Sequence, residues 1–103
     1  MRYADSRTYL VPEDLADLTG PTSGVIELPT HLDWSEQRTY DLGDPAQVGL
    51  MYERVLREAS SPGDLASYLN KDVLIRIWGR LYLPTRVRRQ WESAFPILAR
   101  AAA

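Results

Sequence analysis

Proline residues at helix-start positions limit the second half of this 103-residue chain to short helices. Asp44-Pro45 and Ser61-Pro62 each place a capping side chain directly before a proline, and Pro84 opens a further segment. Proline lacks an amide hydrogen and clashes with the turn before it, so it begins a helix far more readily than it continues one. A series of short helices is therefore predicted from residue 44 onwards.

Apolar residues recur every three or four positions in four segments of this half, as they do on one face of a helix. The first segment runs from Pro45 to near Ser60, and a short one follows Pro62. A third begins after the capping residue Asn70, and a fourth begins at Pro84 and is broken or kinked by Pro96. The Ala-rich tail after Arg100 is expected to fray. The residues expected in the core include Val48, Met51, Tyr52, Val55, Leu56, Leu65, Leu69, Val73, Leu74, Ile77, Trp78, Leu81, Val87, Trp91 and Phe95.

The first half has a different pattern. Residues 25–28 and 38–42 are short runs rich in β-branched or alternating residues, and they predict two strands paired as a hairpin. Residues 1–24 are interrupted by prolines and glycines and are predicted to form a partly flexible arm. The expected fold is α+β, with a short N-terminal β-hairpin followed by a cluster of about four short helices in one domain over residues 25–100.

Charge is divided unevenly along the chain. Residues 1–52 carry three Arg against nine Asp and Glu, whereas residues 53–103 carry nine Lys and Arg against five acids. Such an asymmetry bears on partners rather than on the fold. Cysteine is absent, and no apolar run is long enough for a signal peptide or a membrane span. A cytoplasmic protein without a membrane partner is expected.

Catalytic patterns are weak. His31, Asp33 and Ser35 alternate along the chain, but three side chains on one strand spread over about 13 Å and cannot converge as a hydrolytic triad does. His31 is the only histidine, and the acids around it have no recognised metal-binding spacing. We therefore expect no catalytic residues, no metal site and no cofactor.

Two surfaces remain as candidates for binding. Trp34 lies in a polar stretch between the predicted strands, where it either covers the hairpin or serves as an exposed aromatic anchor. The partner-binding residues expected there are Asp33, Trp34, Glu36 and Tyr40. The second surface is a set of arginines on the last two predicted helices. These arginines suit DNA phosphates, with residues 64–69 and 72–82 as a helix-turn-helix, or an acidic patch on a protein partner or on this protein's own N-terminal half. A solvated helix face is the remaining interpretation. The members of this set are Arg76, Arg80, Arg86, Arg88 and Arg89.

Four segments together resemble small actinobacterial proteins that are encoded beside nucleotidyltransferase toxins of the abortive-infection type. They are residues 28–35, 40–45, 50–59 and 83–92, with the sequences LPTHLDWS, YDLGDP, LMYERVLREA and LPTRVRRQWE. The resemblance covers residues 25–95 and implies an antitoxin-like protein that binds and silences the neighbouring toxin, and that could also repress its own operon. We therefore expect a non-enzymatic protein-binding module, with a small DNA-binding transcriptional regulator as the alternative.

Overall fold

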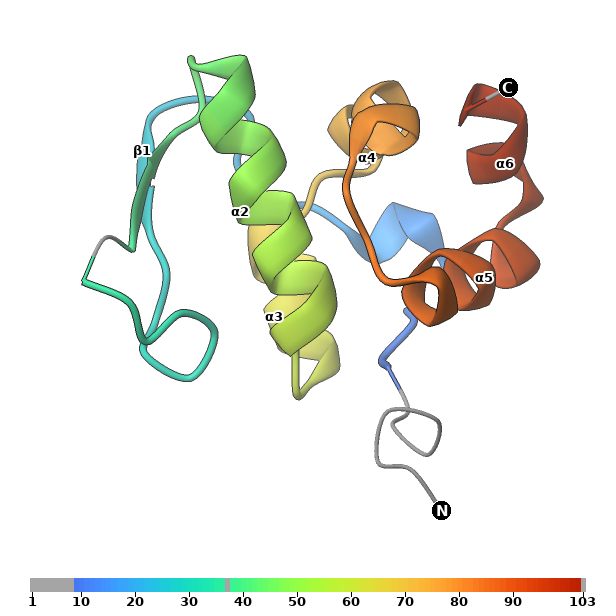
Figure 1. Ribbon diagram of the computed structural model, residues 1–103, viewed down its shortest axis with the longest axis horizontal. Coiled ribbons are helices and arrows are strands. Elements are labelled where there is room, and N and C mark those ends of the chain that lie inside the picture. Colours follow the sequence, from blue (N-terminus) through green and yellow to red (C-terminus); the bar gives the residue numbers. More distant parts are fainter. Residues whose placement is uncertain (1–8, 37, 103) are drawn as a thin grey trace.

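The computed structural model describes residues 9–36 and 38–102, and its α+β architecture confirms the predicted fold class. A two-stranded hairpin lies on one side of the long central helix α2, and α4, α5 and α6 lie on the other side (Figure 1). The elements are η1 (Leu15–Asp17), β1 (Val25–Glu27), β2 (Thr39–Asp41), α2 (Pro45–Glu58), α3 (Pro62–Tyr68), α4 (Lys71–Ile77), η2 (Trp78–Arg80), α5 (Thr85–Ala94) and α6 (Pro96–Ala102).

The two predicted strands form the expected hairpin. β1 and β2 pair antiparallel, with Ile26 opposite Tyr40. Because side chains alternate between the faces of a strand, Ile26 and Tyr40 face the core while their neighbours Val25 and Thr39 are exposed. The hairpin packs against α2 through this inner face.

The helix starts follow the capping pattern of the sequence. Asp44 accepts a hydrogen bond from the Ala46 amide, and Ser61 accepts one from the Asp64 amide. Asn70 accepts from the amides of Asp72 and Val73 at the start of α4. Each cap satisfies amides that have no partner within the first turn of a helix, which is why three helices begin where the sequence predicted.

The last predicted helix is divided in two. α5 ends at Ala94, and Pro96 begins α6, so the proline ends one helix and opens the next rather than kinking a single one. The Ala-rich tail, which we expected to fray after Arg100, is helical as far as Ala102, and α6 buries Leu98 completely. The backbone of α6 passes close to Gly79 in η2. A Cβ added to Gly79 would lie 3.2 Å from the Ala102 Cα.

Residues 15–20, which we placed in a flexible arm, belong to the core. Leu15 and Leu18 are buried, and the Gly20 amide donates to the Leu69 carbonyl at 2.8 Å. Thr19 forms a β-bridge with Asn70, fifty-one positions later in the chain. Backbone pairing with the α3–α4 turn thus holds this part of the chain against the helices, and local sequence does not reveal such a distant partner. Residues 1–8 of the expected arm lie outside the described residues.

The core is formed mainly by the helices. Trp78 and Trp91 are both fully buried, as predicted, and their rings lie 6.2 Å apart between centroids. Phe95 packs at 6.0 Å from Trp91 and is only partly buried. Aromatic pairs at these separations add to the stabilisation that their buried area provides.

Replacing Gly20 by alanine should destabilise the fold. A Cβ at Gly20 would lie 2.7 Å from the Tyr68 carbonyl carbon, and that backbone is held in place at the end of α3. We expect Gly20→Ala to lower the free energy of unfolding by about 1–3 kcal/mol, measured by chemical denaturation. Gly63→Ala is the matched control, because its nearest neighbour is a flexible Ser61 side chain at 3.7 Å. Equal stability of the two variants would contradict this close packing.

Candidate functional site

A buried carboxylate organises the loop between the two strands. The Asp33 side chain has no solvent exposure and accepts hydrogen bonds from the Ser35 amide at 3.0 Å and the Ser35 hydroxyl at 2.6 Å. Its second oxygen accepts from the Tyr40 hydroxyl, which comes from β2. The Arg54 guanidinium of α2 lies 3.9 Å away. The carboxylate therefore joins the loop, β2 and α2 at one point.

These contacts determine the charge state of the pair. Burial raises the pKa of Asp33, but the hydrogen bonds from Ser35 and Tyr40 and the charge of Arg54 outweigh burial, so its pKa is lowered overall. Burial and the Asp33 carboxylate raise the pKa of Tyr40 to about 12. At neutral pH the pair is an ionised carboxylate and a neutral phenol. It has a structural role, because neither group titrates near neutrality.

Trp34 lies on the solvent side of this buried cluster and contacts it through Arg54. Its side chain is 65% exposed, and the Arg54 guanidinium lies 5.7 Å from its ring centre. A cation over an aromatic face is attracted to it, and Arg54 is itself held by Asp33 from below. Of the two positions considered from the sequence, the structure thus shows the exposed one, with the ring supported by a fixed cation.

A groove lies between β2 and α2, and Ser35, which follows Trp34 in the chain, is part of its lining. Its volume is about 430 Å³, and it is lined by Ser35, Thr39, Tyr40, Gln47 and Leu50; we call it the hairpin groove. Leu50 is 57% exposed although it is a large apolar residue on a helix. An exposed tryptophan and an exposed leucine next to a concave surface are features of a binding site.

The four predicted partner-binding residues therefore fall into two groups. Trp34 and Glu36 are exposed, as a partner-binding role requires. Asp33 and Tyr40 are buried and bonded to each other, so the expectation that their side chains contact a partner directly is wrong. The physical reason is that an aspartate in a polar loop can be drawn inside when enough donors surround it. Asp33 and Tyr40 shape the site from beneath.

Sequence reasoning did not single out Leu50, Gln47 or Arg54 as part of this site. A signal was available for Leu50. It lies outside the apolar stripe of α2, in which Val48, Met51, Tyr52 and Val55 face the core. An apolar residue on the solvent side of an amphipathic helix indicates a contact with something outside the fold.

His31 belongs to a separate contact. Its Nε2 lies 2.9 Å from Asp64 Oδ1, which ties the strand-connecting loop to the first turn of α3. The second oxygen of Asp64 accepts from the Ser60 amide at 3.0 Å. Burial raises the pKa of Asp64, but the bonds from Ser60 and His31 outweigh it and lower this pKa overall. His31 pairs with Asp64 while the Ser35 hydroxyl donates directly to Asp33, so the series that a hydrolytic triad requires is not formed.

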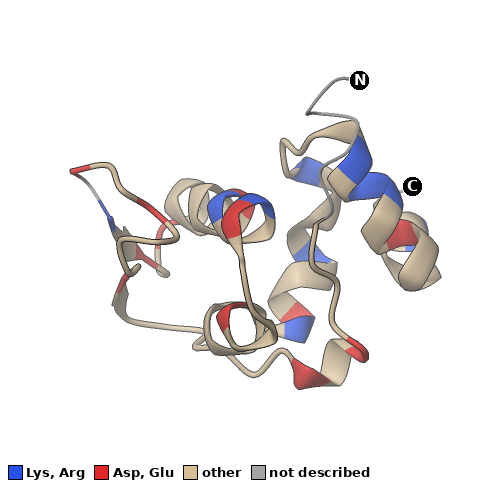
Figure 2. Cartoon of the chain, turned by 90° about the horizontal axis from the view of Figure 1, so that it is seen from below, with Lys and Arg blue, Asp and Glu red and all other residues tan. Residues whose placement is uncertain are grey.

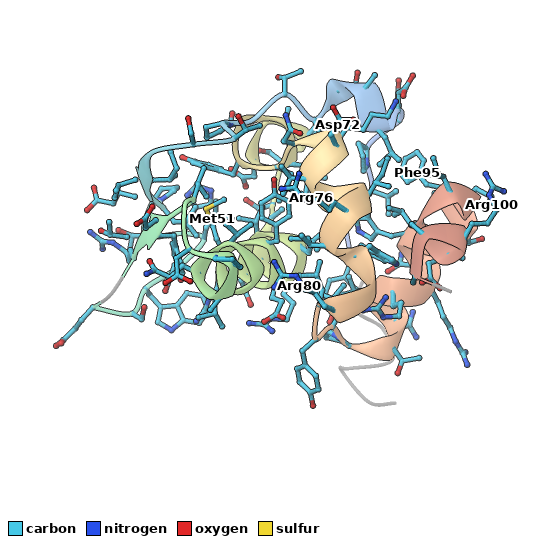
Figure 3. The ribbon with its side chains drawn as sticks, turned by 90° about the horizontal axis from the view of Figure 1, so that it is seen from above. Met51, Asp72, Arg76, Arg80, Phe95 and Arg100 are labelled. Atoms are coloured by element: carbon cyan, nitrogen blue, oxygen red, sulfur yellow. The ribbon has the colours of Figure 1, made fainter. Side chains whose placement is uncertain are left out.

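The predicted arginine set does not form one open face. Arg88 donates to the carbonyl oxygens of Trp78 at 3.3 Å and Leu81 at 2.6 Å, and its guanidinium lies 5.0 Å from the Trp78 ring centre. Arg76 and Arg80 extend from one side of the α4–η2 segment toward α2 (Figure 3), where Arg80 donates to the Pro45 carbonyl at 3.2 Å. Arg86 and Arg89 are exposed on α5. Arg88 and Arg80 thus bond to the protein itself, whereas Arg76, Arg86 and Arg89 are exposed.

The charge asymmetry of the sequence appears in space. Acidic residues are spread over the hairpin end of the molecule, and basic residues gather on α5 at the opposite end (Figure 2). Near the hairpin groove the exposed acids are Glu27, Glu36 and Asp41. The basic side chain of Arg38 lies 3.9 Å from Glu27 and offsets part of that charge. The hairpin end therefore carries exposed acids together with the exposed apolar side chains of Trp34 and Leu50, and Arg54 is the charge that contacts Trp34.

Among residues 9–36 and 38–102, no three His, Asp or Glu side chains come together in an arrangement that could hold a metal ion. Within the same residues, none of the helices has the length and apolar character needed to cross a bilayer.

Comparison with known proteins adds no relative. No protein-family model, no curated protein and no solved structure matches this chain.

Replacing Asp33 by asparagine should destabilise the protein. Asparagine keeps the size of the side chain but removes the charge that Ser35, Tyr40 and Arg54 surround. Hydrogen bonds to a charged group contribute more than neutral ones, so we expect a loss of about 2–3 kcal/mol, measured by urea denaturation at neutral pH. Glu36→Gln is the matched control because Glu36 is exposed in the same loop. A difference below about 0.5 kcal/mol between the variants would contradict the structural role.

Acid should destabilise the protein by protonating the carboxylates of Asp33 and Asp64. The pKa values of Asp33 and Asp64 are lowered from 3.8 in the folded state. The stabilisation they provide is thus complete above about pH 4 and is lost as the pH falls through the lowered pKa values. We expect the free energy of unfolding to decline between about pH 4 and pH 2, and to decline less steeply in Asp33→Asn. An equal slope in both proteins would show that Asp33 does not contribute.

Proposed function

We propose that this protein is a non-enzymatic binding module that acts by docking on another protein, in the manner of an antitoxin that occludes its toxin. One observation carries the proposal. Trp34 is 65% exposed, and the Arg54 guanidinium, which lies 3.9 Å from the buried Asp33 carboxylate, is 5.7 Å from the Trp34 ring centre. A fixed aromatic residue loses little conformational freedom on binding, and tryptophan is among the residues that most often dominate protein interfaces.

The acidic residues at the hairpin end favour a partner with a basic surface. The hairpin end of the molecule carries acidic residues (Figure 2), and Trp34 and Leu50 are exposed there. Complementary charge accelerates association and selects against like-charged partners. A nucleotidyltransferase toxin handles polyanionic substrates in a basic cleft, and an acidic protein surface can cover such a cleft. The resemblance of residues 25–95 to proteins encoded beside such toxins favours the same partner and a cytoplasmic setting.

The alternative of a DNA-binding regulator has less support. Its predicted arginines include Arg88, which is committed to two backbone carbonyls, and Arg80, which bonds to Pro45. That leaves Arg76, Arg86 and Arg89 as the exposed members of the set. Phosphate contacts give DNA affinity that falls steeply with salt, and few such contacts give weak binding. The helical half therefore offers fewer arginines for phosphate contact than the sequence predicted.

Trp34→Ala should weaken the complex with the protein encoded by the neighbouring gene. Loss of a central aromatic anchor costs about 2 kcal/mol or more, which corresponds to about a thirtyfold rise in Kd. Isothermal titration calorimetry with the purified partner measures this change. Tyr82→Ala is the matched control, since Tyr82 is 84% exposed and does not line the hairpin groove.

The same titrations separate the two functions. An unchanged Kd in Trp34→Ala, or a partner that does not bind the wild-type chain, would contradict docking through the hairpin end. Binding of upstream DNA at low salt that is abolished by Arg86→Ala and Arg89→Ala would favour the regulator instead.

A further inference from the structure

The main chain of β2 offers hydrogen-bonding groups to the hairpin groove. The Leu28 amide donates to the Arg38 carbonyl and the Leu42 amide to the Gly24 carbonyl, both at 2.9 Å. Since such bonds alternate along an antiparallel pair, the main-chain groups of Thr39 and Asp41 point away from β1. This edge of β2 lies beside the groove, because Thr39 lines it.

The Gln47 side chain already bonds to the outer edge of β2, in the way that the main chain of a paired strand would. The Asp41 amide donates to the Gln47 Oε1 atom at 2.8 Å. The Gln47 amide nitrogen donates in turn to Asp44 Oδ2 at 3.1 Å. A carboxamide has the same donor and acceptor as a peptide bond, so the edge is satisfied by a group that a bound peptide could replace. An extended segment that pairs with a strand edge is a common form of peptide recognition.

The rest of the groove specifies which side chains such a segment should carry. Leu50 lines the groove and can contact an apolar side chain. Glu36 and Asp41 are exposed beside two of the lining residues, Ser35 and Tyr40. Opposite charges in the ligand would complement these acids.

We propose that the hairpin groove binds an extended segment of the partner in which an apolar side chain is flanked by lysine or arginine. Its main chain would pair with the β2 edge at Asp41 in place of Gln47, and its apolar side chain would lie against Leu50. This inference rests on the proposed function and names the chemistry of the segment that the docking surface recognises.

Selection from a displayed library of random linear peptides against the wild-type chain tests the proposal. Enriched peptides should share an apolar residue with basic neighbours. A synthetic copy of the most enriched peptide should bind Leu50→Ser at least about tenfold more weakly than wild type, and Tyr82→Ala with unchanged affinity. Leu50 is 57% exposed, so its replacement leaves the core intact. No enrichment, acidic peptides, or equal binding to Leu50→Ser would overturn the proposal.

Hydrogen exchange tests the pairing with the strand edge. In Gln47→Ala, the Asp41 amide loses the partner that it has at 2.8 Å and should exchange rapidly when the protein is free. Addition of the synthetic peptide should restore protection of this amide, as followed by NMR. Continued rapid exchange with the peptide bound would overturn the strand-edge mode. Loss of partner binding in Trp34→Ala together with failure of these peptide tests would refute this inference while leaving the proposed function standing.

Discussion

The Asp33 carboxylate is a negative charge removed from water, and residues at the hairpin end of the molecule supply its hydrogen bonds and its counter-charge. A buried charge is costly unless it is paired and hydrogen-bonded, so the loop, β2 and α2 must each supply a group at the same point. Ser35, Tyr40 and Arg54 are those groups. Their convergence fixes the position of the loop, and Arg54 also supports the ring of Trp34. A single internal contact thus determines the shape of the proposed docking surface.

The parts of the fold that could be predicted are those governed by local chemistry. Asp44, Ser61 and Asn70 cap helices because their side chains reach amides two or three residues away, and the sequence shows this directly. The strand pairing followed from two short runs in the same way. The packing of Leu15 and Leu18 could not be predicted, since their partners lie some fifty residues further along the chain.

The candidate site was predicted in part for the same reason. Trp34 stood out as an aromatic residue in a polar stretch, and its exposure is visible in the structure. The burial of Asp33 depends on Arg54, which a different element supplies, and no spacing in the sequence connects the two. Arg88 was expected to be free for a partner, but it bonds to the carbonyl oxygens of Trp78 and Leu81. These partners lie within ten residues of it in the chain, yet the sequence does not reveal the turn that brings them together.

The distant contacts of η1 and α6 bear on how this protein emerges during synthesis. The Lys71 amide donates to the Leu18 carbonyl, and the fully buried Leu98 belongs to the final helix. Core packing is therefore incomplete until α6 has left the ribosome, although the hairpin and α2 emerge well before it. The contacts that hold Trp34 come from residues 33–54, so this surface leaves the ribosome before the core of the helical half is complete.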